Sequence, residues 1–140
     1  LPSHPGHELR GCRLIRDLAA RLPVPRACRD LALLVAEYHT HVHRALELRP
    51  KTILNVLEKT DAFRRPDRFE QFLVTCEADA RGRAGLENRR YEQAGYFRGA
   101  FAAASAVDAG AIAKEVEDKK IPVKIRRARK RAISEFKAAR

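Results

Sequence analysis

The apolar residues of this chain recur at the three- and four-residue spacing of an α-helix in each segment between its prolines and glycines. No segment shows the strict alternation of apolar and polar residues that indicates a half-buried strand. Ala and Leu, with 23 and 14 occurrences, outnumber Val, Ile and Thr, with 18 together, which favours helix over sheet. The sequence therefore predicts an all-α protein, a bundle of six or seven helices.

Prolines, glycines and one aspartate mark the ends of the predicted helices. Pro25 and Pro66 suit the first helical turn, where a missing N–H is not needed, and Asp108 can cap a helix with its carboxylate. Pro122 can begin the last helix. The predicted helical segments are residues 8–21, 25–46, 52–60, 66–81, 91–107 and 108–117, and a basic segment within 119–137. Two of them have a clear apolar face: Cys12, Ile15, Leu18, Ala19 and Leu22 on the first, and Phe69, Phe72, Leu73 and Cys76 on the helix over 66–81.

The composition is typical of one folded domain. Of the 140 residues, 45% are apolar and 34% are charged, which is unlike a disordered chain. No apolar run approaches the roughly 18 residues that a membrane span requires, and no segment resembles a signal peptide, so no membrane partner is expected. The absence of Met predicts that the sequence is a processed or excised part of a longer protein.

Three cysteines, Cys12, Cys28 and Cys76, occur without a Cys-x-x-Cys motif. An odd number at these spacings argues against both a disulfide framework and a zinc knuckle. All three fall at apolar positions of predicted helices, where a free Cys behaves as a small buried hydrophobe. We expect inert core thiols and a reducing, cytoplasmic setting.

The net charge of +11 is concentrated at one end of the chain. Residues 119–140 carry ten basic side chains and one acidic, whereas residues 1–118 have a net charge of only +2. Apolar positions 121, 125, 132/133 and 136, with the stem of Arg129, make this segment an amphipathic helix. Eight basic residues follow one another without an intervening acid: Lys119, Lys120, Lys124, Arg126, Arg127, Arg129, Lys130 and Arg131. They predict a polyanionic partner, with a solvated helix face as the alternative. A membrane surface fits less well, because the apolar face lacks Trp and has few large residues.

Polar residues interrupt two of the predicted apolar rows. On one helix the row continues from Val35 to His39 and His43, and on another it continues from Cys76 to Asp79. A carboxylate on a core-facing row is costly unless it is paired or bound to a metal.

With His4 and His7 nearby in sequence, the candidate cluster is His7, His39, His43 and Asp79. These donors suit a divalent transition metal or Mg²⁺-assisted phosphate chemistry. Two alternatives stay open: the histidines form ordinary hydrogen bonds, and Asp79 pairs with an arginine. His41 is expected on the opposite, solvent-exposed face.

Other catalytic motifs are missing from the sequence. It contains no Gly-rich phosphate loop, no Gly-x-Ser-x-Gly and no Asp-x-Asp pair that could hold two metal ions for nucleotidyl transfer.

Several motifs in register resemble one family, the bacterial CCA-adding enzymes (tRNA nucleotidyltransferases). The resemblance covers residues 4–137 and corresponds to the C-terminal half of such an enzyme, most of its HD domain and its tail. The motifs are His4-Pro5-Gly6-His7-Glu8, Tyr38-His39 with His43-Arg44, Leu48-Arg49-Pro50-Lys51-Thr52, Asp61-Ala62-Phe63-Arg64-Arg65-Pro66, Phe69-Glu70-Gln71, and Glu77-Ala78-Asp79-Ala80-Arg81-Gly82-Arg83 with Gly85.

The resemblance implies an HD-like helical domain over residues 1–90, truncated at its N-terminus, and a helical tail over residues 91–140. The parent enzyme builds or repairs the CCA end of tRNA from CTP and ATP, which a head domain absent from this chain binds. The body and tail hold the tRNA, largely through its phosphates. The chain alone is therefore expected to be inactive as a transferase.

The resemblance also assigns a remnant metal site, for Mg²⁺ or a divalent transition metal. His7 and His39 match downstream histidines of the HD domain, and Asp79 matches its closing aspartate. The sequence departs from the family pattern because it contains no His-Asp dipeptide. Asp118 and Phe136 also stand where relatives often have Gly and Trp.

These observations leave three alternative functions. The first is a tRNA-binding body and tail of a CCA-adding enzyme. The second is a free-standing HD-type phosphohydrolase acting on 2′,3′-cyclic or monoester phosphates. The third is an architectural helical module whose basic tail contacts another acidic partner. The sequence does not indicate an oligomeric state.

Overall fold

The computed structural model describes residues 6–83, 85 and 87–140. Over these residues the chain forms seven α-helices and two short 3-10 helices and no strand, which confirms the all-α prediction. In chain order the elements are α1 (His7–Arg21), α2 (Arg26–His43), η1 (Ala45–Glu47), α3 (Pro50–Lys59), α4 (Pro66–Arg81), α5 (Gln93–Ser105), α6 (Ala109–Glu115), η2 (Asp118–Lys120) and α7 (Ile121–Ala138).

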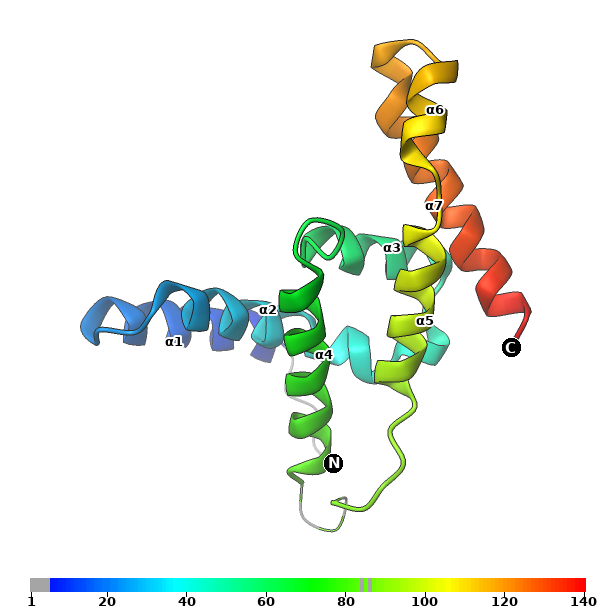
Figure 1. Cartoon of the computed structure of the whole chain (residues 1–140). Helices are drawn as coiled ribbons and strands as arrows, with labels where there is room; N and C mark the ends of the chain where they lie inside the picture. Colours follow the sequence, from blue (N-terminus) through cyan, green and yellow to red (C-terminus); the bar gives the residue numbers. More distant parts are fainter. Residues whose placement is uncertain (1–5, 84, 86) are drawn as a thin grey trace.

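Figure 1 shows a central group of helices from which two arms project. The centre contains α3, α4, α5 and the carboxyl-terminal end of α2, and the hairpin of α1 and α2 extends to the left. α6 and the first part of α7 form the second arm, at the top, and α7 then runs down along α5 and α3. The basic helix α7 and the α1–α2 arm therefore lie on different sides of the core.

Local sequence explains where most helices begin. Pro50 and Pro66 occupy the first turns of α3 and α4, and the Asp108 carboxylate caps α6 by accepting a hydrogen bond of 2.9 Å from the Ala111 N–H. The helix predicted over 25–46 is shorter than expected, because α2 ends at His43. There the chain turns through η1, which buries Ala45 completely, and the residue before Pro50 is then extended, as proline requires.

The hydrophobic core lies between α3, α4 and α5. The inward face predicted for residues 66–81 is confirmed, since all four of its apolar residues, Phe69, Phe72, Leu73 and Cys76, are at most 2% exposed. Full burial of a large apolar side chain contributes about 1.5–3 kcal/mol each. In the described part of the chain, the other large apolar side chains that are fully buried are Ile53, Leu54, Val56 and Leu57 of α3, Phe97 of α5, Val42 of α2 and Ile133 of α7.

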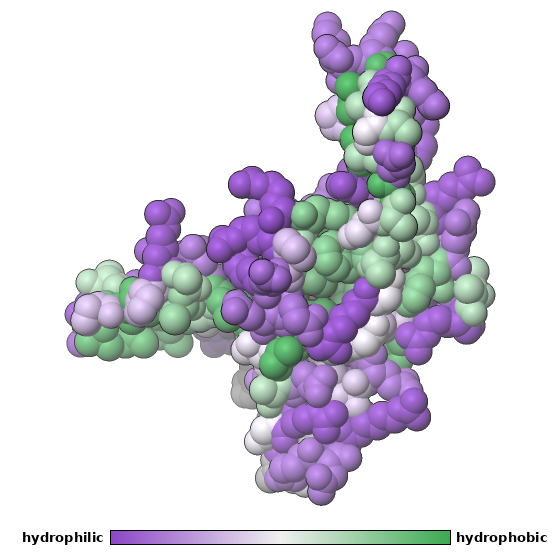
Figure 2. Space-filling model, viewed as in Figure 1, coloured by the Kyte–Doolittle hydropathy of each residue, from purple (hydrophilic) through white to green (hydrophobic). Residues whose placement is uncertain are grey.

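The α1–α2 arm is far less buried than its sequence pattern indicates. The apolar face predicted on α1 included Leu18 and Leu22, yet these side chains are 52% and 51% exposed, and Cys12 is the buried residue of this helix. The prediction is wrong at these leucines because α2 is the main neighbour of α1, and one helix covers only a narrow strip of another. Hydrophobic residues therefore reach the surface of the left arm in Figure 2.

Cys28 also departs from the prediction of three buried thiols. It is exposed, whereas Cys12 and Cys76 are buried, and all three are free. Cys28 lies in the first turn of α2, and this end of α2 lies at the tip of the arm in Figure 1.

α7 combines a charged surface with an apolar seam. Ile133 is fully buried, and the Phe136 ring packs against Tyr96 of α5 with ring centroids 5.4 Å apart. Ile121 and Ile125 are partly buried on the same side, so the predicted amphipathic stripe is confirmed. In the described part of the chain, no helix is both long and apolar enough to span a membrane.

Candidate nucleic-acid interface and histidine cluster

The structure brings three of the predicted histidines into one row. His39 and His43 lie one turn apart on α2 with ring centroids 5.6 Å apart, and the ring of His7, at the start of α1, meets that of His39 edge-on. The Nε2 atoms of His7 and His39 are 3.4 Å apart. The His39 Nδ1–H donates to the Val35 carbonyl at 2.7 Å, so its Nε2 presents a lone pair toward His7. His4 lies outside the described residues.

Asp79 joins this row through His43. Its Oδ2 lies 2.9 Å from His43 Nε2, and His43 Nδ1 lies 2.8 Å from the Tyr91 hydroxyl. Because a carboxylate accepts, Nε2 carries the proton, and Nδ1 then accepts from the Tyr91 O–H. The partner of Asp79 is thus a histidine; the nearby Arg81 pairs with Glu77 at 3.0 Å.

Burial controls the protonation of this pair. It lowers the pKa of His43 below its ordinary value, while the hydrogen bond to Asp79 opposes the shift. Burial also raises the pKa of Tyr91, which keeps its hydroxyl protonated as a donor. His43 is therefore neutral, and both of its ring nitrogens are hydrogen-bonded. These two hydrogen bonds connect α2 to α4 and to the segment before α5.

These donors do not fit a metal ion as they are arranged. His7 and His39 face each other, but the carboxylate of Asp79 is directed to His43. Among the residues with a described structure, no group of three or more His, Cys, Asp or Glu side chains is placed to hold a metal.

His41 differs from its prediction as a solvent-exposed residue. Its ring is partly buried against Tyr38, with centroids 5.7 Å apart, and its Nδ1 is buried without a hydrogen-bond partner. The correction follows from helix geometry, because residues three apart lie on one face, and Tyr38 covers that face.

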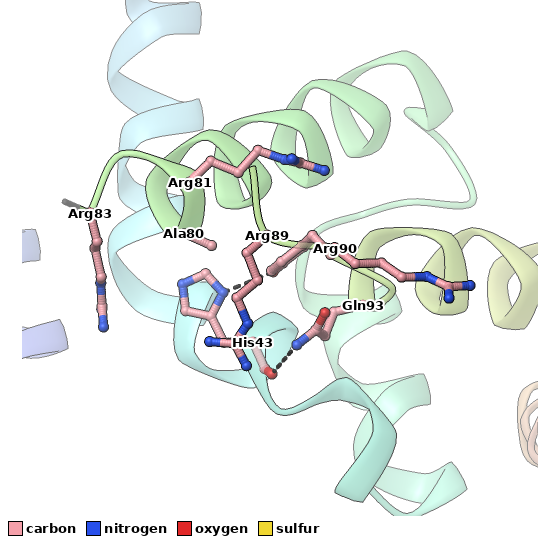
Figure 3. Close-up of a pocket in the computed structure, with 8 residues that line it drawn as sticks. His43, Ala80, Arg81, Arg83, Arg89, Arg90 and Gln93 are labelled. Carbon is pink, nitrogen blue, oxygen red and sulfur yellow. Dashed lines mark hydrogen bonds between the residues drawn. The ribbon is translucent and has the colours of Figure 1, made fainter. Parts of the chain in front are cut away.

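A pocket of about 200 Å³ lies beside His43 and is rich in arginine. Figure 3 shows Arg89 directed toward His43, whereas Arg81 and Arg90 project away from it. Gln93 closes one side by donating from its amide to the His43 carbonyl at 3.2 Å. No role was predicted for Arg83, Arg89 or Arg90. The signal that could have shown a positively charged pocket is the occurrence of four arginines within ten residues.

The eight basic residues of the tail separate into two groups. Two of them bind to the protein itself. The Arg126 guanidinium pairs with Glu58 at 3.1 Å and also donates to Asn55, and the Arg129 guanidinium lies 3.8 Å above the Phe63 ring. The other six are exposed: Lys119, Lys120, Lys124, Arg127, Lys130 and Arg131.

The exposed group is therefore the candidate nucleic-acid interface. Arg131 forms an ion pair of 3.3 Å with Glu135, but both side chains are more than two-thirds exposed, so this pair contributes little. The apolar seam of α7 fixes these cations on a rigid helix. Such a surface can neutralise phosphates without reading bases.

No family model and no solved structure matches this chain. Curated relatives do match it. The "Multifunctional CCA protein" of Dechloromonas aromatica is 52% identical over 137 residues, which are 97% of this chain and 33% of the relative. Proteins of the same name from Thioalkalivibrio sulfidiphilus and Pseudomonas fluorescens are 50% and 49% identical over 99% and 98% of this chain, and 34% of each relative is covered.

The chain thus spans about one third of the length of the curated relatives it matches. The family resemblance drawn from the motifs is confirmed. Over nearly its whole length, the chain matches the C-terminal part of these multifunctional CCA proteins.

Proposed function

We propose that this chain is the tRNA-binding body and tail of a CCA-adding tRNA nucleotidyltransferase, which synthesises and repairs the 3′ CCA end of tRNA. Residues 1–90 are the HD-like body and residues 91–140 the tail. CTP and ATP bind to a head domain elsewhere in the longer protein, so the chain alone carries no transferase activity. The enzyme works in the cytoplasm.

The observation that carries this proposal is the exposed cation surface on a helix that is locked to the core. Ile133 and Phe136 hold one face of α7 against α5. The helix that carries the cations on the other face is therefore already ordered before RNA binds. Duplex RNA displays phosphates and 2′-hydroxyls, and its narrow major groove hides the bases. Recognition of tRNA by shape and charge fits this surface.

Binding of tRNA measured against salt tests the proposal. The logarithm of the association constant should fall with the logarithm of the salt concentration by about 0.7–0.9 per phosphate contacted. The triple variant Lys119→Gln, Lys120→Gln, Lys124→Gln should lower this slope, whereas Arg13→Gln, Arg16→Gln, Arg21→Gln on α1 removes the same charge and should change it little. Substitution is preferable to deletion of α7, because deletion also removes the buried Ile133. Affinity that does not change with salt would refute the proposal.

We further propose that His7, His39 and Asp79 belong to a divalent-metal site, for Mg²⁺ or a transition metal, that needs additional ligands. The proximity of His7 and His39 supports it, and Asp79 would have to leave His43 to join the ligands. Calorimetric titration of the chain with Mn²⁺ should then show no tight binding. Stoichiometric micromolar binding that is lost in His39→Ala would show that these residues form a complete site.

A phosphohydrolase acting on 2′,3′-cyclic or monoester phosphates is the second candidate function. The arginine-lined pocket beside His43 favours it, because guanidinium groups bind phosphates in a bidentate manner. Turnover of a 2′,3′-cyclic nucleotide by the purified chain, lost in His39→Ala, would support this activity. No turnover with added Mg²⁺ or Mn²⁺ would exclude it for the chain alone.

A further inference from the structure

A positively charged groove of about 570 Å³ runs between the start of α3 and the middle of α7. One wall is formed by Arg49, Pro50 and Lys51, which belong to a motif that the proposed function leaves without a role. The other wall is formed by Arg127, Lys130, Arg131 and Ser134.

The residues of the α7 wall occur at positions i, i+3, i+4 and i+7, so they share one face of the helix. All four are exposed, as are Arg49 and Lys51 across the groove. Five cations and one hydroxyl therefore line this groove, and none of the residues lining it is acidic.

Contacts between α3 and α7 hold the two walls in place. The Lys137 ammonium donates to the Leu48 carbonyl at 2.8 Å, just before the α3 wall. Toward the other end of α3, Arg126 pairs with Glu58 at 3.1 Å and donates to Asn55. The groove is therefore fixed by side chains that do not line it. Of its own cations, Arg131 forms only the exposed pair with Glu135, which an anionic ligand can replace.

Physical chemistry favours one class of ligand. Five like charges repel one another across the groove, and an anionic chain that follows it would relieve this repulsion. Arginine binds phosphate oxygens in a bidentate manner, lysine supplies a point charge, and the Ser134 hydroxyl can donate to the same oxygens. An apolar or basic partner would gain nothing from this lining.

We infer that this groove binds a segment of the sugar-phosphate backbone of tRNA, and that Arg49 and Lys51 are RNA-binding residues outside the basic tail. The inference rests on the proposed function, since it assumes that the chain binds tRNA. It adds which residues of the body take part, Arg49 and Lys51, and that they hold the backbone together with the α7 wall.

The test compares two variants that lose the same charge. Arg49→Gln, Lys51→Gln removes one wall of the groove, and the control Arg13→Gln, Arg21→Gln removes two exposed cations from the α1 arm. The groove variant should weaken tRNA binding about tenfold or more at 0.1 M salt, and it should lower the salt slope by about 1.4–1.8. The control should bind within about twofold of the wild type, because its charges lie away from the groove.

The outcomes separate the two proposals. If the wild type binds tRNA and both variants weaken equally, the groove is not a binding site, while the proposed function stands. If the wild type does not bind tRNA, both are overturned.

Acetylation of lysines in the wild-type chain is a second readout that does not depend on the variants folding. Bound tRNA should protect Lys51 and Lys130 at least severalfold, whereas Lys114 of α6 should stay reactive. Equal reactivity of all three lysines in the complex would contradict the inference.

Discussion

The helices α1 and α7 show how little amphipathic pattern alone says about burial. α1 has an apolar row rich in leucine, yet Leu14 and Leu18 are 68% and 52% exposed. α7 is the most basic helix of the chain, yet Ile133 is fully buried. The difference lies in their neighbours: α1 packs mainly on α2, whereas α7 packs on both α3 and α5. The number of elements that surround a helix therefore decides how much of its apolar face contributes to stability.

The largest expected effect is on thiol reactivity. Burial raises the pKa of Cys76 to about 12, which reduces its thiolate about a thousandfold at pH 8, and the core also blocks access to it. We expect Cys28 to react at least about a thousandfold faster than Cys76. Cys12 should fall between them, because an arm with few buried contacts opens more readily than the core.

Labelling of the native chain with iodoacetamide, followed by peptide mass mapping, measures this order. If Cys12 and Cys76 react at the same slow rate, the arm is as stable as the core, and the contrast between α1 and α7 is wrong. Labelling in urea serves as the control, since all three thiols should then react alike.

Truncation of one apolar residue on each helix tests the contrast directly. Ile133→Ala removes a fully buried side chain and should lower the free energy of unfolding by about 2–5 kcal/mol. Leu18→Ala removes a half-exposed side chain and should cost less than about 1 kcal/mol. Urea denaturation followed by circular dichroism gives both values, and equal losses would contradict the comparison.

Two glycines of α5 sharpen the account of how α7 docks. A Cβ added at Gly99 would lie 2.6 Å from Cε2 of Phe136, so Gly99→Ala should displace this ring and destabilise the protein by about 1 kcal/mol net. A Cβ added at Gly95 would meet no neighbouring atom within 4 Å, so Gly95→Ala should stabilise the helix by about 0.5–1 kcal/mol.

Thermal unfolding of the two variants should therefore shift the midpoint in opposite directions. Stabilisation by both would mean that α7 accommodates the added methyl group freely and is not tightly packed on α5.

The smallest effect separates two neighbouring arginines of the tail. Arg126→Gln removes the pair with Glu58 and should lower the free energy of unfolding by about 0.5–1 kcal/mol. Arg127→Gln should leave stability unchanged and weaken tRNA binding instead, because this side chain is exposed in the groove. Unfolding and binding curves for both variants test the separation, and loss of binding alone in Arg126→Gln would contradict it.

Local sequence was sufficient to predict most of the secondary structure. Helical periodicity, the prolines that open α3 and α4, and the Asp108 cap act within a few residues, so they can be read along the chain. The end of α2 was not predictable in this way, because the chain turns there to bury Ala45 against distant helices.

The candidate sites show the same division. The sequence placed His7, His39, His43 and Asp79 together, and the structure does bring them into one cluster. It could not show that Asp79 bonds to His43, since these residues are 36 positions apart and their pairing depends on how α2 meets α4.

The sequence by itself determined that this protein is helical, that its charge lies in the last helix, and which family it resembles. Only the tertiary structure decided that Arg126 and Arg129 contact the rest of the protein while neighbouring cations of α7 face solvent. It also decided that Arg49 and Lys51 lie across a groove from those exposed cations. The physical reason is how far apart in the sequence the interacting residues lie. Periodicity and capping depend on residues within one or two helical turns, whereas the pairing of Arg126 with Glu58 depends on residues 68 positions apart, which only packing brings into contact.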